Sequence, residues 1–162
     1  MTAALDLVLR HNVWANRHLL AFCAKLDAAI LDRATPGTYG TVRTTLQHIV
    51  SGEQFYITLL CGDRIGAEVD ENVPRPFEEL ISIVTRTGER AGTLARDDDA
   101  ERTVMVEGTP YRAGVIYAQL VHHGNEHRGQ VKSILGANGL EPPGVSAWGF
   151  ATDDAKTSAQ AG

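Results

Sequence analysis

The sequence predicts an all-α fold, a four-helix bundle with one long crossover connection. Four segments carry apolar side chains at the spacing of an amphipathic helix, each over about 20 residues. Stretches that contain Gly and Pro separate these segments, and a single short alternating stretch is the other regular pattern. Helices of this number and length can bury their apolar stripes against one another around one core.

The first two helices are expected over residues 2–26 and 42–60. Thr2 is a candidate N-cap for the first, because its hydroxyl can accept from a backbone N–H of the first turn. A Pro-Gly pair interrupts the pattern before the second helix begins. The second helix is expected to end at Gly62, since glycine adopts the left-handed conformation that terminates many helices.

The third and fourth helices are expected over residues 77–94 and 113–138. Pro76 precedes the third, and two acidic side chains in its first turn suit the positive end of the helix dipole. The fourth helix is stopped by an Asn-Gly pair and then by two prolines. Between these helices, residues 102–114 alternate and turn at a Glu-Gly pair, which indicates a short hairpin or an extended crossover.

The chain of 162 residues is long enough for one domain with a single sizeable core. We expect this domain to span residues 1–150. Residues 151–162 are rich in Ala, Asp, Thr, Ser and Gln, a composition typical of a frayed end, and are expected to form a flexible C-terminal tail.

The net charge of −5 disfavours a nucleic-acid partner, because such a protein needs a basic face to displace counterions. No stretch approaches the ~20 apolar residues that span a bilayer, and the N-terminus has Asp6 where a signal peptide would be basic. The expected compartment is therefore the cytoplasm, with a small-molecule substrate or thiol as partner and no membrane. Homodimerisation through a helical face is also expected. Cys23 and Cys61 show no CxxC spacing and are expected to be small, partly buried apolar residues.

Three of the six histidines lie in HHGNEHRGQ, residues 122–130. His123 and His127 are four residues apart on the predicted fourth helix, about 40° apart around its axis, so both imidazoles can reach one ion. His122 is rotated by about 100° from His123 and is expected at the surface or in packing. Because two ligands make a weak site, a zinc site with one open position needs a third protein ligand.

That third ligand could come from His11, His18 or His48. His48 is the most attractive of the three, since it lies among apolar neighbours early in the second predicted helix. A lone helical histidine is more often structural than a ligand, and periodicity alone leaves the choice open.

Four stretches resemble the DinB family, also called the DinB/YfiT-like proteins. The family's first-helix signature is similar to HNVWANRHLL (11–20), and its second helix is similar to TVRTTLQHIVSGEQFYI (41–57). Its fourth-helix motif, in which a His-x3-His pair runs into Arg-Gly-Gln, resembles HHGNEHRGQV (122–131). Its C-terminal ending of prolines and aromatic residues resembles PPGVSAWGF (142–150). The resemblance covers nearly the full chain, and the fourth-helix motif is its most specific part.

The resemblance implies a DinB/YfiT-like bundle in which His48, His123 and His127 bind a divalent metal ion, zinc first and nickel as the alternative. The family often has two adjacent histidines before Arg-Gly-Gln, and Glu126 replaces the first of them here. The resemblance also implies an S-transferase that uses a low-molecular-weight thiol of the bacillithiol or mycothiol type. Two other functions stay open, a metal-dependent hydrolase that activates water and a non-enzymatic, stress-related metal-binding module. The sequence identifies no catalytic residue.

The sequence also leads to expectations for five other residues. Glu53 is rotated by about 140° from the candidate ligand on its own helix, so it is expected either to orient a ligand on another helix or to form a surface salt bridge. Arg128 is expected to pair with an acidic group or to cap a neighbouring helix, and Gly129 to let a neighbouring segment approach closely. Trp14 and Trp148 are expected in the core.

Overall fold

The computed structural model of the chain describes residues 3–97 and 99–160, and it confirms the predicted all-α fold. The predicted N-cap Thr2 lies outside the described residues. The helices are α1 (Ala3–Cys23), α2 (Ala28–Leu31), α3 (Val42–Cys61), α4 (Phe77–Asp97), α5 (Ala113–Ala137) and α6 (Ala147–Gln160), and the strands are β1 (Thr103–Val106) and β2 (Thr109–Arg112).

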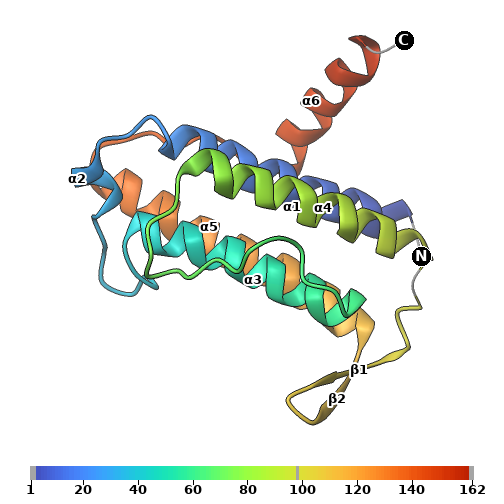
Figure 1. The fold of residues 1–162 in the computed structure, drawn as a ribbon. Helices are drawn as coiled ribbons and strands as arrows, with labels where there is room; N and C mark the ends of the chain where they lie inside the picture. Colours follow the sequence, from blue (N-terminus) through green and yellow to red (C-terminus); the bar gives the residue numbers. More distant parts are fainter. Residues whose placement is uncertain (1–2, 98, 161–162) are drawn as a thin grey trace.

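Helices α1, α3, α4 and α5 form the bundle (Figure 1). Helix α1 packs against α4 and α5, and α3 packs against the same two, so α1 and α3 lie diagonally opposite. Helices α1 and α5 run in one direction and α3 and α4 in the other (Figure 1). Because α3 and α4 are parallel, residues 62–76 between them return along the length of the bundle and form the long crossover.

The crossover, residues 62–76, is held against α3 by two buried glutamines that lie two helical turns apart. Gln47 donates to carbonyl oxygens and accepts from a backbone N–H within residues 70–75. Gln54 makes the same kinds of bond with backbone groups of residues 65–69. An extended segment without its own secondary structure must satisfy its backbone groups elsewhere. The two side-chain amides do so and fix the path of the crossover over α3.

The ends of the long helices follow the capping signals in the sequence. Thr41 caps α3, its Oγ1 accepting from the backbone N–H of Thr44 at 3.2 Å. Gly62 ends α3 with φ 77°, and Gly139 follows α5 with the same φ, in the left-handed region that favours glycine. Strands β1 and β2 form a short hairpin, one of the two arrangements expected here, and its turn residues Glu107 and Gly108 both have positive φ as in a type I′ turn.

The core consists of two apolar clusters separated by a polar layer. The first cluster lies at the end of the bundle near α2 and includes Leu19, Leu46 and Ile134. The second lies toward the hairpin and includes Ile57 and Leu120. Between them, the buried side chains are polar or charged: Asn12 and Asn16 on α1, Glu53 on α3, Thr87 on α4, and His127 and Arg128 on α5.

The C-terminal segment differs from the expectation of a frayed end, because residues 147–160 form α6. The hydroxyl of Ser146 accepts from the N–H of Gly149 at 3.2 Å and caps the helix, and the buried Phe150 packs against Trp14. Trp148 is 87% exposed, so its predicted place in the core is wrong; Phe150, two residues later, takes that place. Asp154 also pairs with Arg10 of α1 at 2.8 Å, and Asp153 lies 3.6 Å from His18. Helix α6 projects away from the bundle (Figure 1), and flexibility of the tail stays a prediction.

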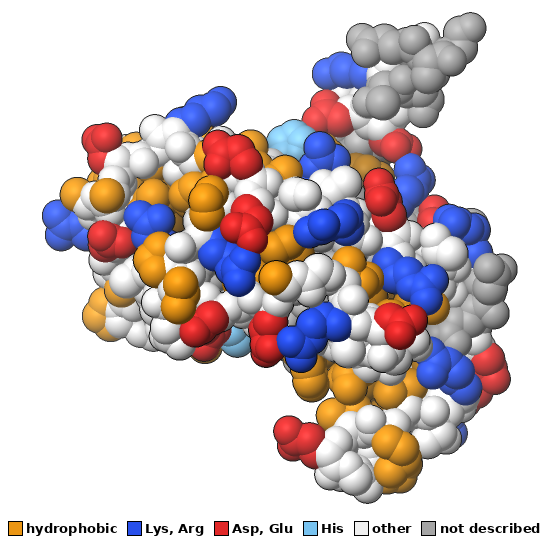
Figure 2. All heavy atoms as spheres, viewed as in Figure 1, with side chains coloured by type: hydrophobic (Ala, Val, Ile, Leu, Met, Phe, Trp, Pro, Cys, Tyr) orange, Lys and Arg blue, Asp and Glu red, His pale blue; other side chains and the backbone are white. Residues whose placement is uncertain are grey.

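Basic and acidic side chains are interspersed over the face of the bundle seen in Figure 2. Among the described helices, none is long and apolar enough to cross a membrane.

Candidate metal centre

The structure brings together the three histidines that the sequence singles out. His48 comes from α3, and His123 and His127 come from successive turns of α5, which packs against α3. One ring nitrogen from each lies within 4.8 Å of the others, and the ring centroids are 4.6–4.7 Å apart. Nε2 of His48 is 3.0 Å from Nε2 of His123. The three imidazoles therefore converge on one point between the two helices.

Two of the rings are oriented by hydrogen bonds on their outer nitrogens. Nδ1 of His48 lies 2.7 Å from Oε2 of Glu71, and Nδ1 of His127 lies 3.0 Å from Oε1 of Gln130. Because both partners are acceptors, Nδ1 carries the proton in each neutral ring and Nε2 keeps its lone pair. This is the tautomer required for a ring that binds a metal through Nε2.

Glu71 belongs to the crossover and is shared between His48 and Tyr39. The Tyr39 hydroxyl donates to Oε1 of Glu71 at 2.7 Å, and its ring stacks on His48 with centroids 3.9 Å apart. The bond from Tyr39, followed by that from His48, lowers the pKa of Glu71 below its usual range. The carboxylate therefore stays ionised and acts as an acceptor toward both neighbours. The backbone N–H of Tyr39 also donates to Gln130, so Tyr39 connects the partners of two histidines.

His123 fits between the helices because α3 has a glycine opposite it. A Cβ at Gly52 would lie 2.5 Å from Cε1 and 3.0 Å from Nδ1 of His123, closer than real contacts allow. Burial, followed by the neighbouring histidines, lowers the pKa of His123 to about 4. The ring is thus neutral at neutral pH, the form that binds metals.

This donor set fits a divalent metal ion. Three imidazole nitrogens at 2.0–2.1 Å from a tetrahedral zinc ion would lie roughly 3.3 Å apart, close to the 3.0 Å between His48 and His123. Three neutral protein ligands also leave a position for water or substrate, as in catalytic zinc sites. The Nδ1 partners of His48 and His127 supply the outer hydrogen bonds that metal-binding histidines usually have.

A cavity of about 300 Å³ opens beside the histidines. His48 and His123 form part of its wall, together with Ser51, Tyr56 and Arg64. Its volume lies at the lower end of the range for small-molecule sites, about 300–1,000 Å³. A small ligand can therefore reach two of the three imidazoles from this side.

The other three histidines lie away from this centre. His122 is exposed and pairs with Glu126 at 3.3 Å on the surface of α5, as predicted. Nε2 of His11 is 2.9 Å from the Val145 carbonyl oxygen, and Nδ1 of His18 is 3.0 Å from that of Trp14. His11 and His18 therefore serve contacts on the outer side of α1, and neither is the third member of the cluster.

The structure also shows where Glu53, Arg128 and Gly129 lie. Glu53 is only 4% exposed, so the surface salt bridge is wrong, and its carboxylate is bound by amides of α1. Arg128 is buried and lies near the carboxylate of Glu53, although asparagine side chains intervene. The close approach predicted at Gly129 is also wrong, because a Cβ there would meet nothing within 4 Å. Gly52 and Gly124 are the helical glycines that make room around the centre.

The sequence reasoning missed Glu71, Tyr39 and Gly52. The two glutamines spaced seven residues apart on one helix face were a signal that a segment follows α3, though not which of its side chains reaches His48. Nothing in the local sequence indicates that Tyr39 stacks on that ring.

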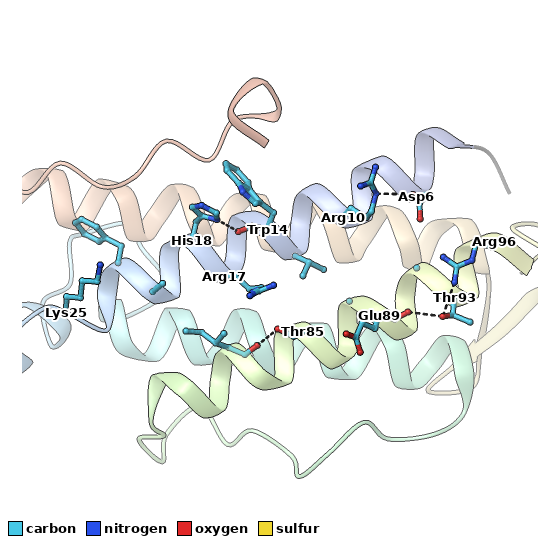
Figure 3. Close-up of a pocket in the computed structure, with 16 residues that line it drawn as sticks. Asp6, Arg10, Trp14, Arg17, His18, Lys25, Thr85, Glu89, Thr93 and Arg96 are labelled. Atoms are coloured by element: carbon cyan, nitrogen blue, oxygen red, sulfur yellow. Dashed lines mark hydrogen bonds and ion pairs between the residues drawn. The ribbon is translucent and has the colours of Figure 1, made fainter. Parts of the chain in front are cut away.

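A larger groove of about 930 Å³ lies between α1 and α4 (Figure 3). Its lining includes apolar side chains such as Val13 and Ile81 and charged side chains such as Arg17 and Glu89. It shares no lining residue with the cavity beside His48 and His123. The groove is therefore separate from the candidate metal centre.

The fold and the three converging imidazoles define a class of protein, a four-helix bundle with a histidine cluster compatible with metal binding. Within that class, the chain belongs to the DinB family, whose family model matches residues 1–156. A DinB-like protein from Bacillus cereus ATCC 10987, known from its crystal structure, has a similar fold with a TM-score of 0.67. That likeness covers 84% of this chain and 91% of the other, at 18% sequence identity. Among curated proteins, none matches the chain.

Proposed function

We propose that His48, His123 and His127 hold a divalent metal ion, zinc in the first place and nickel as the alternative. We further propose that the protein is a metal-dependent S-transferase for a low-molecular-weight thiol of the bacillithiol or mycothiol type. The observation that carries the metal site is the convergence of three ring nitrogens within 4.8 Å. Membership of the DinB family is compatible with such a site.

The residues around the histidines suit a site that admits a small ligand. Glu71 and Gln130 hold two imidazoles so that their Nε2 atoms face inward. The cavity beside His48 and His123 gives a thiol and its electrophile access from one side.

The transfer forms a bond between the thiol sulfur and an electrophilic carbon. The bond from that carbon to its leaving group breaks, the leaving group departs with the electron pair, and the thiol proton passes to solvent. A divalent metal ion held at the site would supply the Lewis acidity that favours the ionised form of a thiol or of water.

A conjugation assay tests this activity. Zinc-loaded protein is incubated with bacillithiol or mycothiol and monochlorobimane, and the fluorescent conjugate is measured against protein treated with a chelator. The transferase proposal expects conjugation above the rate without protein, and loss of that excess after metal removal. A rate equal to the protein-free reaction with both thiols would overturn it.

Two other functions are outcomes of the same set of assays. Turnover of an ester or amide without any thiol would identify a metal-dependent hydrolase, in which water takes the place of the thiol. Tight metal binding without either activity would identify a non-enzymatic module that stores or senses an ion, a role that fits a stress-related protein.

We also propose a cytoplasmic homodimer. The groove between α1 and α4 and the projecting α6, with Trp148 87% exposed, offer apolar surface that a second copy would cover. Light scattering coupled to size exclusion tests this directly. A mass near twice 17.5 kDa supports the dimer, and a mass equal to one chain at micromolar concentration contradicts it.

A further inference from the structure

The polar layer that divides the core lies at the level of the candidate metal centre. It contains a buried carboxylate, Glu53, and a buried guanidinium, Arg128, with exposed fractions of 4% and 2%. Asn12 and Asn16, also buried, lie between these charges. Isolated charges and unpaired polar groups are costly in a core, so two charged and two amide side chains in one layer call for a specific arrangement.

Each asparagine bridges the two charges with both ends of its amide. Asn12 donates from Nδ2 to Oε1 of Glu53 at 3.2 Å, and its Oδ1 accepts from Nη1 of Arg128 at 2.7 Å. Asn16 donates to Oε2 of Glu53 at 2.9 Å and accepts from the same Nη1 at 2.6 Å. The four side chains form a closed array that joins α1, α3 and α5.

The hydrogen bonds of the array all point the same way. Every bond runs from the guanidinium through an amide to the carboxylate, so both asparagine amides must face the same way. A single amide turned around would point a donor at Arg128 and an acceptor at Glu53. The array is therefore complementary in only one set of charges and orientations, which is the property that gives a buried polar network its specificity.

Two members of the array are also direct sequence neighbours of residues at the candidate metal centre. Arg128 follows His127 directly, and Glu53 follows Gly52, the glycine that admits the ring of His123. Gly124, the next residue after His123, is required as well, because a Cβ there would lie 2.7 Å from Oδ1 of Asn12 and 2.9 Å from Nη1 of Arg128. A rotation or shift of α5 that moved its two histidines would also move Arg128 and break the bonds from Arg128 to Asn12 and Asn16.

We propose that the array of Asn12, Asn16, Glu53 and Arg128 is a positioning device that fixes α5 against α3 and thereby holds His123 and His127 in register with His48. This inference rests on the proposed metal site. It assigns to Glu53, Asn12 and Asn16 a role in metal affinity, although none of them is a ligand.

The polarity of the array allows a test by relocation of a charge. Glu53→Gln turns Oε2 into an N–H donor that faces the Nδ2 donor of Asn16. Asn16→Asp places a carboxylate oxygen against Oε2 of Glu53. In the double variant Glu53→Gln with Asn16→Asp, the new amide of residue 53 donates to the new carboxylate, which still accepts from Arg128. The bonds, the net charge and the side-chain sizes are then restored.

The readout is the binding of Co²⁺, whose visible absorption reports both affinity and coordination geometry. Titrations of the purified full chain compare wild type, each single variant and the double variant. Urea unfolding of the apo-proteins measures stability in parallel. Ile57→Ala is the matched control, because Ile57 lies one turn beyond Glu53 on α3 and is fully buried in the second apolar cluster. This variant is expected to lower stability, and the Ile57 side chain takes part in none of the hydrogen bonds of the array.

The proposal expects Glu53→Gln to weaken Co²⁺ binding by about tenfold or more and to change the spectrum, as loss of outer-sphere partners does. The double variant regains the wild-type affinity and spectrum, and Ile57→Ala keeps both at reduced stability. If Glu53→Gln fails to fold, Asn16→Ala, which keeps both charges and one bridge, carries the same expectation. Reduced stability of the folded array variants with unchanged Co²⁺ affinity would overturn the positioning role. Unchanged affinity in His48→Ala would instead overturn the metal site itself.

Discussion

Oε2 of Glu71 lies 2.7 Å from Nδ1 of His48, although 23 residues separate them in sequence. The pairing exists because the crossover returns along α3, where two glutamine side chains hold its backbone. It gives His48 a fixed tautomer and an ionised partner before any metal binds. Carboxylate–histidine pairs of this kind raise the basicity of a metal-binding ring.

Replacing Glu71 by Gln should lower zinc affinity by about tenfold, the lower end of the effect of outer-sphere substitutions. The amide oxygen can still accept from His48, but the negative charge is lost. Competition with a chromophoric chelator measures the change. Glu68→Gln is the control, since it removes the same charge from the same segment, where the carboxylate pairs with the exposed Arg64. An equal loss in both variants would show that the hydrogen bond to His48 is not responsible.

Gly52→Ala should impair metal binding while leaving the fold intact. The added methyl group would lie 2.5 Å from Cε1 of His123 and must displace that ring. The helix itself gains stability, since Ala is favoured over Gly in a helix by about 1 kcal/mol. Gly129→Ala makes the same chemical change on α5 with nothing within 4 Å.

Zinc titration of the two glycine variants by calorimetry separates the effects. We expect Gly52→Ala to bind with at least about tenfold lower affinity, comparable to an outer-sphere defect. Gly129→Ala is expected to bind as wild type does. Wild-type affinity in Gly52→Ala would mean that His123 does not need its observed position.

Cys23 should resist alkylation in the folded protein, whereas the partly exposed Cys61 reacts. Burial raises the pKa of the Cys23 thiol from 9.0 to about 12, so the reactive thiolate is scarce at pH 8.5. Treatment with iodoacetamide followed by peptide mass spectrometry gives the site of modification. Equal modification of both cysteines in native protein would contradict the burial of Cys23.

The raised pKa of the Cys23 thiol also makes the free energy of unfolding depend on pH. Between pH 9 and about 12 the folded state retains the Cys23 proton and the unfolded state releases it. The free energy of unfolding therefore falls as the pH rises above 9. This contribution should be absent from Cys23→Ala, which is compared with wild type by urea unfolding at pH 8 and pH 10.

Gly88 lets α4 approach α1 closely, and its replacement by Ala should destabilise the bundle. The new Cβ would lie 2.2 Å from Cγ2 of Val13. Overpacking of this kind costs about 1–3 kcal/mol, which outweighs the helix preference for Ala. Urea unfolding should show the loss, and Val13→Ala added to Gly88→Ala should recover part of it. A more stable Gly88→Ala protein would mean that α1 and α4 are not packed at this contact.

The four long helices could be predicted because their apolar spacing, caps and breaking residues agree with one another. The pairing of His123 with His127 follows from the helical repeat alone. The fate of the C-terminal segment could not be predicted, since α6 depends on a serine cap and on tertiary contacts with α1, among them Phe150 on Trp14 and Asp154 with Arg10. Composition suggested a frayed end because it carries no information about such contacts.

The surroundings of the histidines were beyond sequence reasoning for a different reason. Tyr39 and Glu71 lie in loops, where no periodicity relates a side chain to a face. Their positions are set by tertiary hydrogen bonds, from Tyr39 to Gln130 and from Gln47 to the backbone at Glu71. Burial of Glu53 was likewise hidden, because its partners Asn12 and Asn16 lie on another helix.

The most direct test of the central claim is the metal content and affinity of wild-type protein beside His48→Ala and His127→Ala. Elemental analysis after zinc loading and dialysis gives the stoichiometry, and chelator competition gives the affinity. We expect one zinc ion per wild-type chain and loss of stoichiometric binding in both variants, because each removes one of three converging imidazoles. Retention of stoichiometric zinc at wild-type affinity in both variants would contradict the three-histidine centre.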